Sequence, residues 1–294
     1  MSINLYKNEG KNTPYALSGN PGNIFFIGLL IGPALVLALS IVYAYIDVYN
    51  PFIYLTLIVF AGMLLGLVMI QKLVVKLSKC RSERSSLIYG SAVGLFAVYA
   101  CWVAFLFVLT RRFNESYSLG YLQLLTNPAL VWESMGYLND VGWFTIFKVR
   151  VSGGVLWVIW FIEALGILGA GILGGLGVMH EEVFCEDCNG WADDIDFNLR
   201  LAITDKEAVK SMIENNINGL LELPAATDLQ SEHIRVNIHH CAGCNKTKTL
   251  DVDLLSYTTN DKGETKESSV DFSPVFVISE RQFESFKQKR DMTL

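Results

Sequence analysis

Two C-x-x-C motifs in the C-terminal part of the chain hold the residues best suited to chemistry. Cys185-Glu-Asp-Cys188 and Cys241-Ala-Gly-Cys244 each place two thiols in one short turn. Four thiolates from two such turns complete the tetrahedral site that zinc prefers, and they leave no open position on the ion for a substrate. We therefore expect one structural Zn²⁺ ion, bound by Cys185, Cys188, Cys241 and Cys244.

The same four cysteines could also serve in three other ways. Iron accepts the same four sulfur ligands, so the sequence leaves iron open. Disulfides suit an exported domain, whereas the charge pattern described below predicts a reducing compartment. A thioredoxin-like redox pair opens a helix within a βαβ unit, and neither motif does so. His239 and His240 adjoin the second motif, but four cysteines already fill a zinc shell, so we expect these histidines to lie outside it.

The elements that position the cysteines follow from the residues between and after them. Residues 189–240 separate the motifs, a longer insertion than the roughly 15–20 residues of a common zinc ribbon. Thr204-Asp-Lys-Glu207 is a capping box that predicts a helix inside the insertion. Apolar residues then alternate with polar ones over Ile234–Ile238, which predicts a strand leading into the second motif.

The segment after the second motif continues this pattern. Leu250–Leu254 alternates as a strand, Asp261-Lys-Gly263 indicates a hairpin turn, and Val270–Ile278 predicts a returning strand. Ser279-Glu-Arg-Gln282 is a capping box that predicts a final helix. The cysteines and their flanking strands resemble zinc-ribbon or rubredoxin-like modules as a structural class, and the resemblance covers no more of the chain than that.

Four long apolar runs occupy the N-terminal half, and each is near the roughly 20 residues that a bilayer core requires. Backbone groups inside lipid must satisfy one another, so runs of this length are expected to be helices. The sequence thus predicts an α-helical membrane bundle of four transmembrane helices, followed by a small α+β domain with a zinc-ribbon-like tetracysteine site. The predicted spans are Ile24–Ile46, Phe52–Ile70, Leu87–Leu109 and Val155–Val178.

Glycine pairs at a four-residue step recur in these spans and predict close helix packing, because glycine lets another backbone approach. The pairs are Gly28 and Gly32, Gly62 and Gly66, Gly90 and Gly94, and Gly171 and Gly175.

Charge divides the chain in the same way. Residues 179–294 hold 12 Lys and Arg against 22 Asp and Glu, so this part carries a net charge of −10. Basic residues between the second and third spans, from Lys72 to Arg84, predict that this link is cytoplasmic. Both termini would then be cytoplasmic.

The expected domains are a tail at 1–23, a membrane domain at 24–178 with an outer interfacial segment at 111–150, and an acidic zinc-binding domain at 179–294.

Within the outer segment, Asn127-Pro128 is a good start for a helix, and Val131 and Met135 follow at helical spacing. We expect an amphipathic helix at the membrane surface.

Glu163 is the one acidic residue inside the predicted spans. Placing a carboxylate inside the hydrocarbon core of a membrane costs on the order of 3 kcal/mol, which favours an inward orientation of the side chain or its protonation. It is a candidate functional residue in the membrane, although polar contact between helices is the simpler interpretation.

The sequence therefore favours a non-enzymatic, membrane-anchored sensor, adaptor or effector that binds a protein partner through its acidic domain. The alternative is an oligomeric channel or transporter subunit with Glu163 in the pathway. Expected partners are the lipid bilayer, a protein and further copies of the chain, but not nucleic acid, because an acidic domain repels phosphates. The sequence holds no short catalytic motif such as G-x-S-x-G, a Walker loop or H-E-x-x-H.

Overall fold

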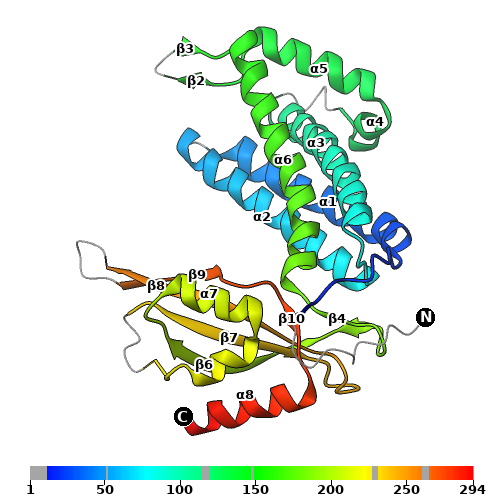
Figure 1. The fold of residues 1–294 in the computed structure, drawn as a ribbon. Helices are drawn as coiled ribbons and strands as arrows, with labels where there is room; N and C mark the ends of the chain where they lie inside the picture. Colours follow the sequence, from blue (N-terminus) through cyan, green and yellow to red (C-terminus); the bar gives the residue numbers. More distant parts are fainter. Residues whose placement is uncertain are drawn as a thin grey trace. The chain divides into compact units, whose positions relative to one another are not determined.

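The chain forms two compact units in the computed structural model, which describes residues 12–50, 52–113, 119–146, 149–226, 231–259 and 265–293 (Figure 1). One unit comprises Ser18–Glu181. The other joins the described residues of Met1–Leu17 to those of Glu182–Leu294. Residues 12–17, which lie in the predicted tail, are therefore an integral part of the C-terminal unit.

Four helices of the first unit are long and apolar enough to cross a membrane, which confirms the predicted spans. Their most apolar windows have a mean hydropathy between 2.1 and 2.6. They pack side by side, with α1 and α6 each lying against both α2 and α3. The four helices are α1 (Ile24–Tyr49), α2 (Ile53–Ser78), α3 (Glu83–Phe113) and α6 (Gly154–Glu181).

Glycine sets how closely α3 and α6 approach. A Cβ atom on Gly171 would lie only 2.8 Å from the carbonyl oxygen of Gly90 and 2.9 Å from Cα of Gly94. A second contact joins α1 to α3, where Tyr89 covers Gly28 and donates a hydrogen bond of 2.9 Å to its carbonyl oxygen. These contacts confirm the packing role predicted for those glycines. Gly62 differs, because no atom would lie within 4 Å of an added Cβ there.

The helices run beyond the predicted spans, and this changes the inventory of charges. Helix α1 continues to Tyr49 and includes Asp47, so Glu163 is not the one acidic residue in a spanning helix as predicted. The backbone hydrogen bonds of a helix continue past the apolar residues that suit lipid, so hydropathy marks the lipid-facing part and not the helix end.

The segment between α3 and α6 contains the predicted amphipathic helix. Helix α4 (Tyr121–Thr126) leads into α5 (Pro128–Val141), where the side chain of Asn127 accepts a hydrogen bond from the Leu130 amide. Val131 and Met135 of α5 are buried against α3 and α6, whose ends α5 crosses (Figure 1). Two short strands, β2 (Thr145–Ile146) and β3 (Val149–Arg150), precede α6.

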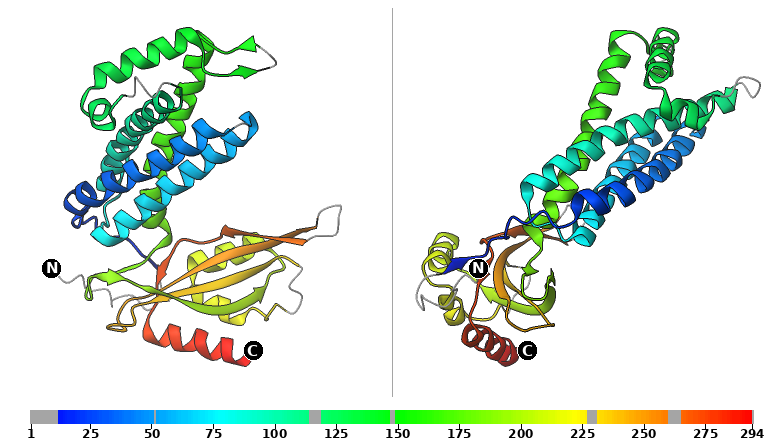
Figure 2. Two further views of the ribbon diagram at one scale, coloured as in Figure 1. Left: turned by 180° about the vertical axis from the view of Figure 1, so that it is seen from behind. Right: turned by 90° about the vertical axis from the view of Figure 1, so that its right-hand side faces the viewer.

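The second unit is built on an antiparallel sheet with the strand order β1-β10-β8-β7-β6, and β9 also pairs with β8 (Figure 2). A separate hairpin consists of β4 (Phe184–Cys185) and β5 (Gly190–Trp191). The strands of the sheet are β1 (Thr13–Pro14), β6 (Asp193–Ala202), β7 (His233–His240), β8 (Lys248–Thr259), β9 (Thr265–Asp271) and β10 (Phe276–Val277).

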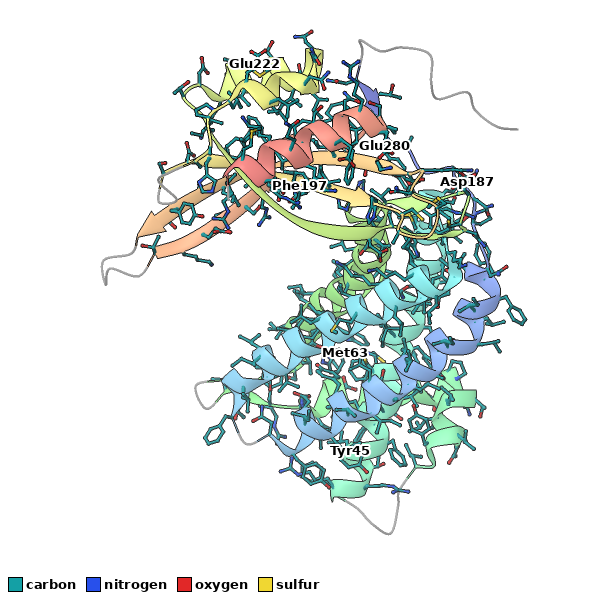
Figure 3. All side chains as sticks on the ribbon, turned by 90° about the horizontal axis from the view of Figure 1, so that it is seen from below. Tyr45, Met63, Asp187, Phe197, Glu222 and Glu280 are labelled. Atoms are coloured by element: carbon teal, nitrogen blue, oxygen red, sulfur yellow. The ribbon has the colours of Figure 1, made fainter. Side chains whose placement is uncertain are left out.

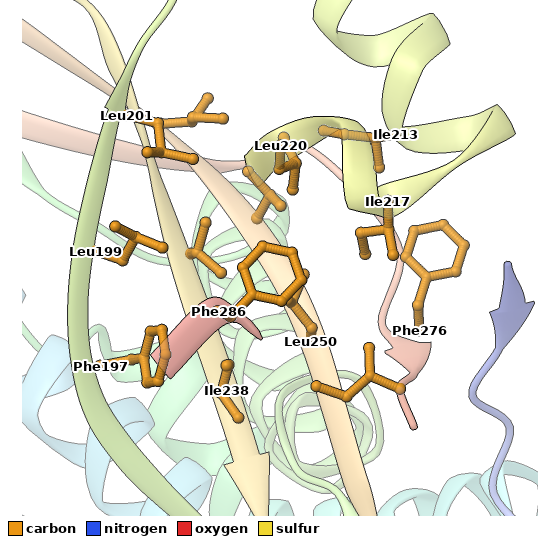
Figure 4. Close-up of a cluster of buried hydrophobic side chains, with 14 of the residues drawn as sticks. Phe197, Leu199, Leu201, Ile213, Ile217, Leu220, Ile238, Leu250, Phe276 and Phe286 are labelled. Carbon is orange, nitrogen blue, oxygen red and sulfur yellow. The ribbon is translucent and has the colours of Figure 1, made fainter. Parts of the chain in front are cut away.

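One face of the sheet packs under α7 (Lys206–Asn215), the 3-10 helix η2 (Ile217–Glu222) and α8 (Glu280–Thr293). Alternate strand residues point into this core, as the period of a strand requires (Figure 4). Burying each such side chain contributes about 1.5–3 kcal/mol. The core includes Phe197, Leu199, Leu201, Ile213, Leu220, Ile234, Val236, Ile238, Leu250, Val252, Phe276 and Phe286.

The predicted local signals of this unit had different outcomes. The capping box before α8 is confirmed, because Ser279 and Gln282 exchange hydrogen bonds between side chain and backbone. The box before α7 is wrong by one residue, since Asp205 is the cap and accepts from the Glu207 and Ala208 amides. The turn predicted at Asp261–Gly263 lies outside the described residues.

The single returning strand predicted at Val270–Ile278 is divided into β9 and β10. Pro274 lies between them and has no amide proton for a ladder, which explains the break.

Candidate metal centre

The four predicted cysteines come together, with all Sγ atoms within 4.8 Å of one another. A tetrahedral ion with bonds of about 2.3 Å needs sulfurs roughly 3.8 Å apart. The Sγ atoms of Cys185 and Cys244, one from each motif, are 3.4 Å apart. Figure 3 labels Asp187, which lies in the turn of the first motif. Four thiols in this arrangement can hold a metal ion.

The first motif is the turn of the β4–β5 hairpin, in which Cys185 pairs with Gly190. The backbone amide of Cys188 donates a hydrogen bond to the sulfur of Cys185, and the side chain of Thr247, three residues after the second motif, donates another. Asn189 follows with a φ of 49°, the left-handed conformation that asparagine tolerates better than most residues. The backbone thus turns back directly after the second cysteine.

The second motif repeats this geometry between β7 and β8. The Cys241 amide donates to the Thr247 carbonyl at 3.0 Å, and the Asn245 amide donates to the Cys241 carbonyl at 2.8 Å. Asn245 has a φ of 57°, so each motif ends in a left-handed asparagine. A Cβ atom on Gly243 would lie 3.2 Å from the Cys188 sulfur, so glycine here leaves room for the sulfur of the other motif.

The electrostatics of the cluster favour a cation at its centre. The Lys246 backbone amide points at the Cys244 sulfur and lowers the pKa of that thiol to about 7. Hydrogen bonds with the Cys244 and Cys241 sulfurs raise the pKa of Cys188 to about 12, and burial raises the pKa of Cys185. One thiolate therefore opposes ionisation of its neighbours. A divalent ion reverses this, because a coordinating thiol is deprotonated outright.

The N-terminal segment braces the first motif, which the sequence did not reveal. The Tyr15 hydroxyl accepts a hydrogen bond from the Phe184 amide at 2.8 Å and donates one to the Phe184 carbonyl at 3.1 Å. Phe184 immediately precedes the first cysteine, and its ring lies edge-on to Trp191 across the hairpin. Strand β1 continues this attachment by pairing with β10.

A buried lysine braces the second motif. The Lys248 side chain is 2% exposed, and its ammonium group donates to the Asn245 carbonyl and to the Glu280 carboxylate at the start of α8. It therefore joins the turn of the second motif to the last helix. Lys246, two residues earlier, is 66% exposed and reaches Asp187 at 3.4 Å, a surface pair of little energetic weight.

The histidines near the second motif have other partners. His239 Nε2 lies 2.7 Å from Asp251 Oδ1 on the neighbouring strand, and the His240 ring stacks on Phe283. Arg235 and Asp253, 2.7 Å apart, extend this polar row along β7 and β8. These pairs stabilise the strands on either side of the second motif.

Glu163 belongs to the other unit, on α6, and is half-buried. Asp47 on α1 is a second half-buried acidic residue of the spanning helices. The Asp47 carboxylate accepts a hydrogen bond from Thr56 of α2.

Sequence reasoning found the four cysteines but missed the residues that hold them. The repeated asparagine after each motif was the available signal, because a turn with positive φ favours that residue. Tyr15 and Lys248 gave no such signal, since Phe184 and Glu280 are distant from them in the sequence.

No known family model, curated protein or solved structure matches the chain.

Proposed function

We propose that this is a multi-pass membrane protein whose C-terminal unit binds one structural Zn²⁺ ion and presents a zinc-stabilised surface to a protein partner. The clustering of four cysteine sulfurs within 4.8 Å carries the proposal. Hydrogen bonds from backbone and hydroxyl groups to these sulfurs support it, because such donors orient metal-bound thiolates. A four-thiolate site is closed, so the ion stabilises the fold instead of performing chemistry.

A non-enzymatic role as sensor, adaptor or effector fits the remaining features. Residues 179–294 carry a net charge of −10, which favours a partner with basic groups and disfavours nucleic acid and anionic lipid headgroups.

The proposed orientation places both termini in the cytoplasm. Strand β1 precedes the first span and pairs with β10, which follows the last one, and this pairing supports placing both on one side of the membrane. The basic residues between α2 and α3 favour the cytoplasmic side for the adjoining helix ends. A reducing compartment would also keep the thiols available for a metal.

The decisive experiment is elemental analysis of the detergent-purified protein, together with its mass in solution. We expect one zinc per chain, and loss of that zinc in Cys185→Ser and Cys241→Ser. Cys80→Ser is the matched control, because Cys80 is also buried but lies in the other unit. Structural zinc contributes about 10–16 kcal/mol in small zinc-binding peptides, so the serine variants should lose protease resistance in the C-terminal unit while the helices stay inserted.

Finding iron in place of zinc would support the four-cysteine site and correct only the identity of the metal. Wild-type protein without stoichiometric metal, and with the same protease resistance as Cys185→Ser, would refute the proposal.

A second candidate is an ion-conducting oligomer. Glu163 favours it, because this acidic residue is half-buried on a helix that can span a membrane and such residues commonly mark ion pathways. This candidate predicts a ring of chains in solution and ion flux in liposomes that Glu163→Gln abolishes. An adaptor would show no flux in either protein.

A further inference from the structure

An apolar cavity of about 520 Å³ lies in the membrane unit between α3, α5 and α6. Half of the residues that line it are aromatic. Four indole rings follow one another, from Trp102 to Trp160 at 4.6 Å, from Trp160 to Trp157 at 5.3 Å and from Trp157 to Trp132 at 5.4 Å between centroids. The single hydroxyl in the wall, that of Tyr99, donates to the Leu124 and Leu125 carbonyls and is thereby satisfied.

The position of the cavity determines what can reach it. Its walls are parts of two helices that can cross a membrane and of α5, which lies across their ends (Figure 1). Leu95 and Phe161 at its rim are 62% and 64% exposed, so the cavity is continuous with the apolar surface that these helices offer to lipid. Water gains little there, because the wall surface is predominantly apolar.

The shape of the wall favours a thin, flexible occupant over another helix. Helices in membranes associate through small residues that let the backbones approach. The wall is instead made of bulky rings, and Ala164 is its one small side chain. Glycines of α6 that suit helix packing, such as Gly171 and Gly174, already contact α3 and α2.

We propose that this cavity binds one acyl chain of a membrane phospholipid. Its volume falls within the range of about 300–1,000 Å³ that is usual for ligand pockets. The chain would lie against the indole faces, while the headgroup would remain at the membrane surface near α5. Met135, 9% exposed, adds an adaptable contact to the aromatic wall.

The test uses the full chain in phosphatidylcholine vesicles that contain a small fraction of phosphatidylcholine with a diazirine near the end of one acyl chain. Irradiation followed by digestion and mass spectrometry maps the adducts. We expect them to concentrate on cavity residues of α3, α5 and α6. In Ala164→Phe, a phenyl ring occupies part of the cavity. Displacing about two methylene groups of the acyl chain should lower these adducts roughly ten-fold.

Leu165→Phe is the matched control, because the neighbouring residue on α6 is 51% exposed and lies outside the cavity wall. It should leave the adducts unchanged. Val98→Phe places a ring in the cavity from α3 and provides the test if Ala164→Phe fails to fold. Adducts that spread evenly over the lipid-facing helices, or that are unchanged in both phenylalanine variants, would overturn the proposal. The proposal would also be overturned if no adducts formed in the cavity and Leu95→Cys formed disulfide-linked dimers, because a second copy of the chain would then cover the cavity.

Discussion

Replacing Gly171 by alanine should weaken the membrane unit, whereas the same change at Gly169, two residues earlier on α6, should not. Both residues are helical, so alanine gains the same helix propensity, about 1 kcal/mol, at each. Comparing the two variants therefore isolates packing. An added Cβ meets the Gly90 carbonyl oxygen at 2.8 Å and Gly94 Cα at 2.9 Å in the first variant, and nothing within 4 Å in the second.

The magnitude follows from this geometry. Carbon atoms pack best at about 3.5–4.0 Å, so α3 and α6 would have to separate by several tenths of an ångström along this contact. Overpacking of this kind costs about 1–3 kcal/mol. At about 2–4 °C per kcal/mol for a unit of this size, Gly171→Ala should melt some 2–12 °C below Gly169→Ala.

Thermal unfolding of both variants in the same detergent, followed by tryptophan fluorescence, measures this difference. Equal melting temperatures would refute the close approach of α3 and α6 at these glycines.

Two further predictions concern the supports of the metal centre. Tyr15→Phe removes two hydrogen bonds to Phe184 and should lower the free energy of unfolding of the C-terminal unit by about 1–3 kcal/mol, measured by denaturant unfolding. An unchanged denaturation midpoint would mean that the N-terminal segment does not stabilise the first motif. Lys248→Met should lower the free energy of unfolding by about 2–3 kcal/mol and hasten metal loss to a chelator, because the contacts with Glu280 and Asn245 are lost. The exposed control Lys246→Met should stay within about 0.5 kcal/mol of wild type, and similar effects of both variants would contradict the burial of Lys248.

The sequence was most informative where one physical requirement acts locally. Hydropathy over some 20 residues identified all four long helices, and cysteine spacing identified the sulfur cluster. Asn127-Pro128 and Ser279–Gln282 also marked helix starts correctly, because caps are satisfied by residues three or four positions away.

Features that depend on distant partners escaped sequence reasoning. Strand β1 has two residues, one of them Pro14, and no periodicity could reveal its pairing with β10. Lys248 resembles a surface lysine until the structure supplies Glu280 as its partner. The break at Pro274 was foreseeable, since proline interrupts a strand ladder, but the alternating residues around it outweighed that signal.

The pairing of β1 with β10 has a consequence for biosynthesis. Thr13 is made before the four long helices, and its partner Val277 is made after them. At about 5–20 residues per second, the first strand must wait on the order of tens of seconds, while all four helices are inserted, before its place in the sheet exists. The C-terminal unit can therefore be completed only after all four long helices have been made. A chain that stops before β10 would leave β1 without its partner strand.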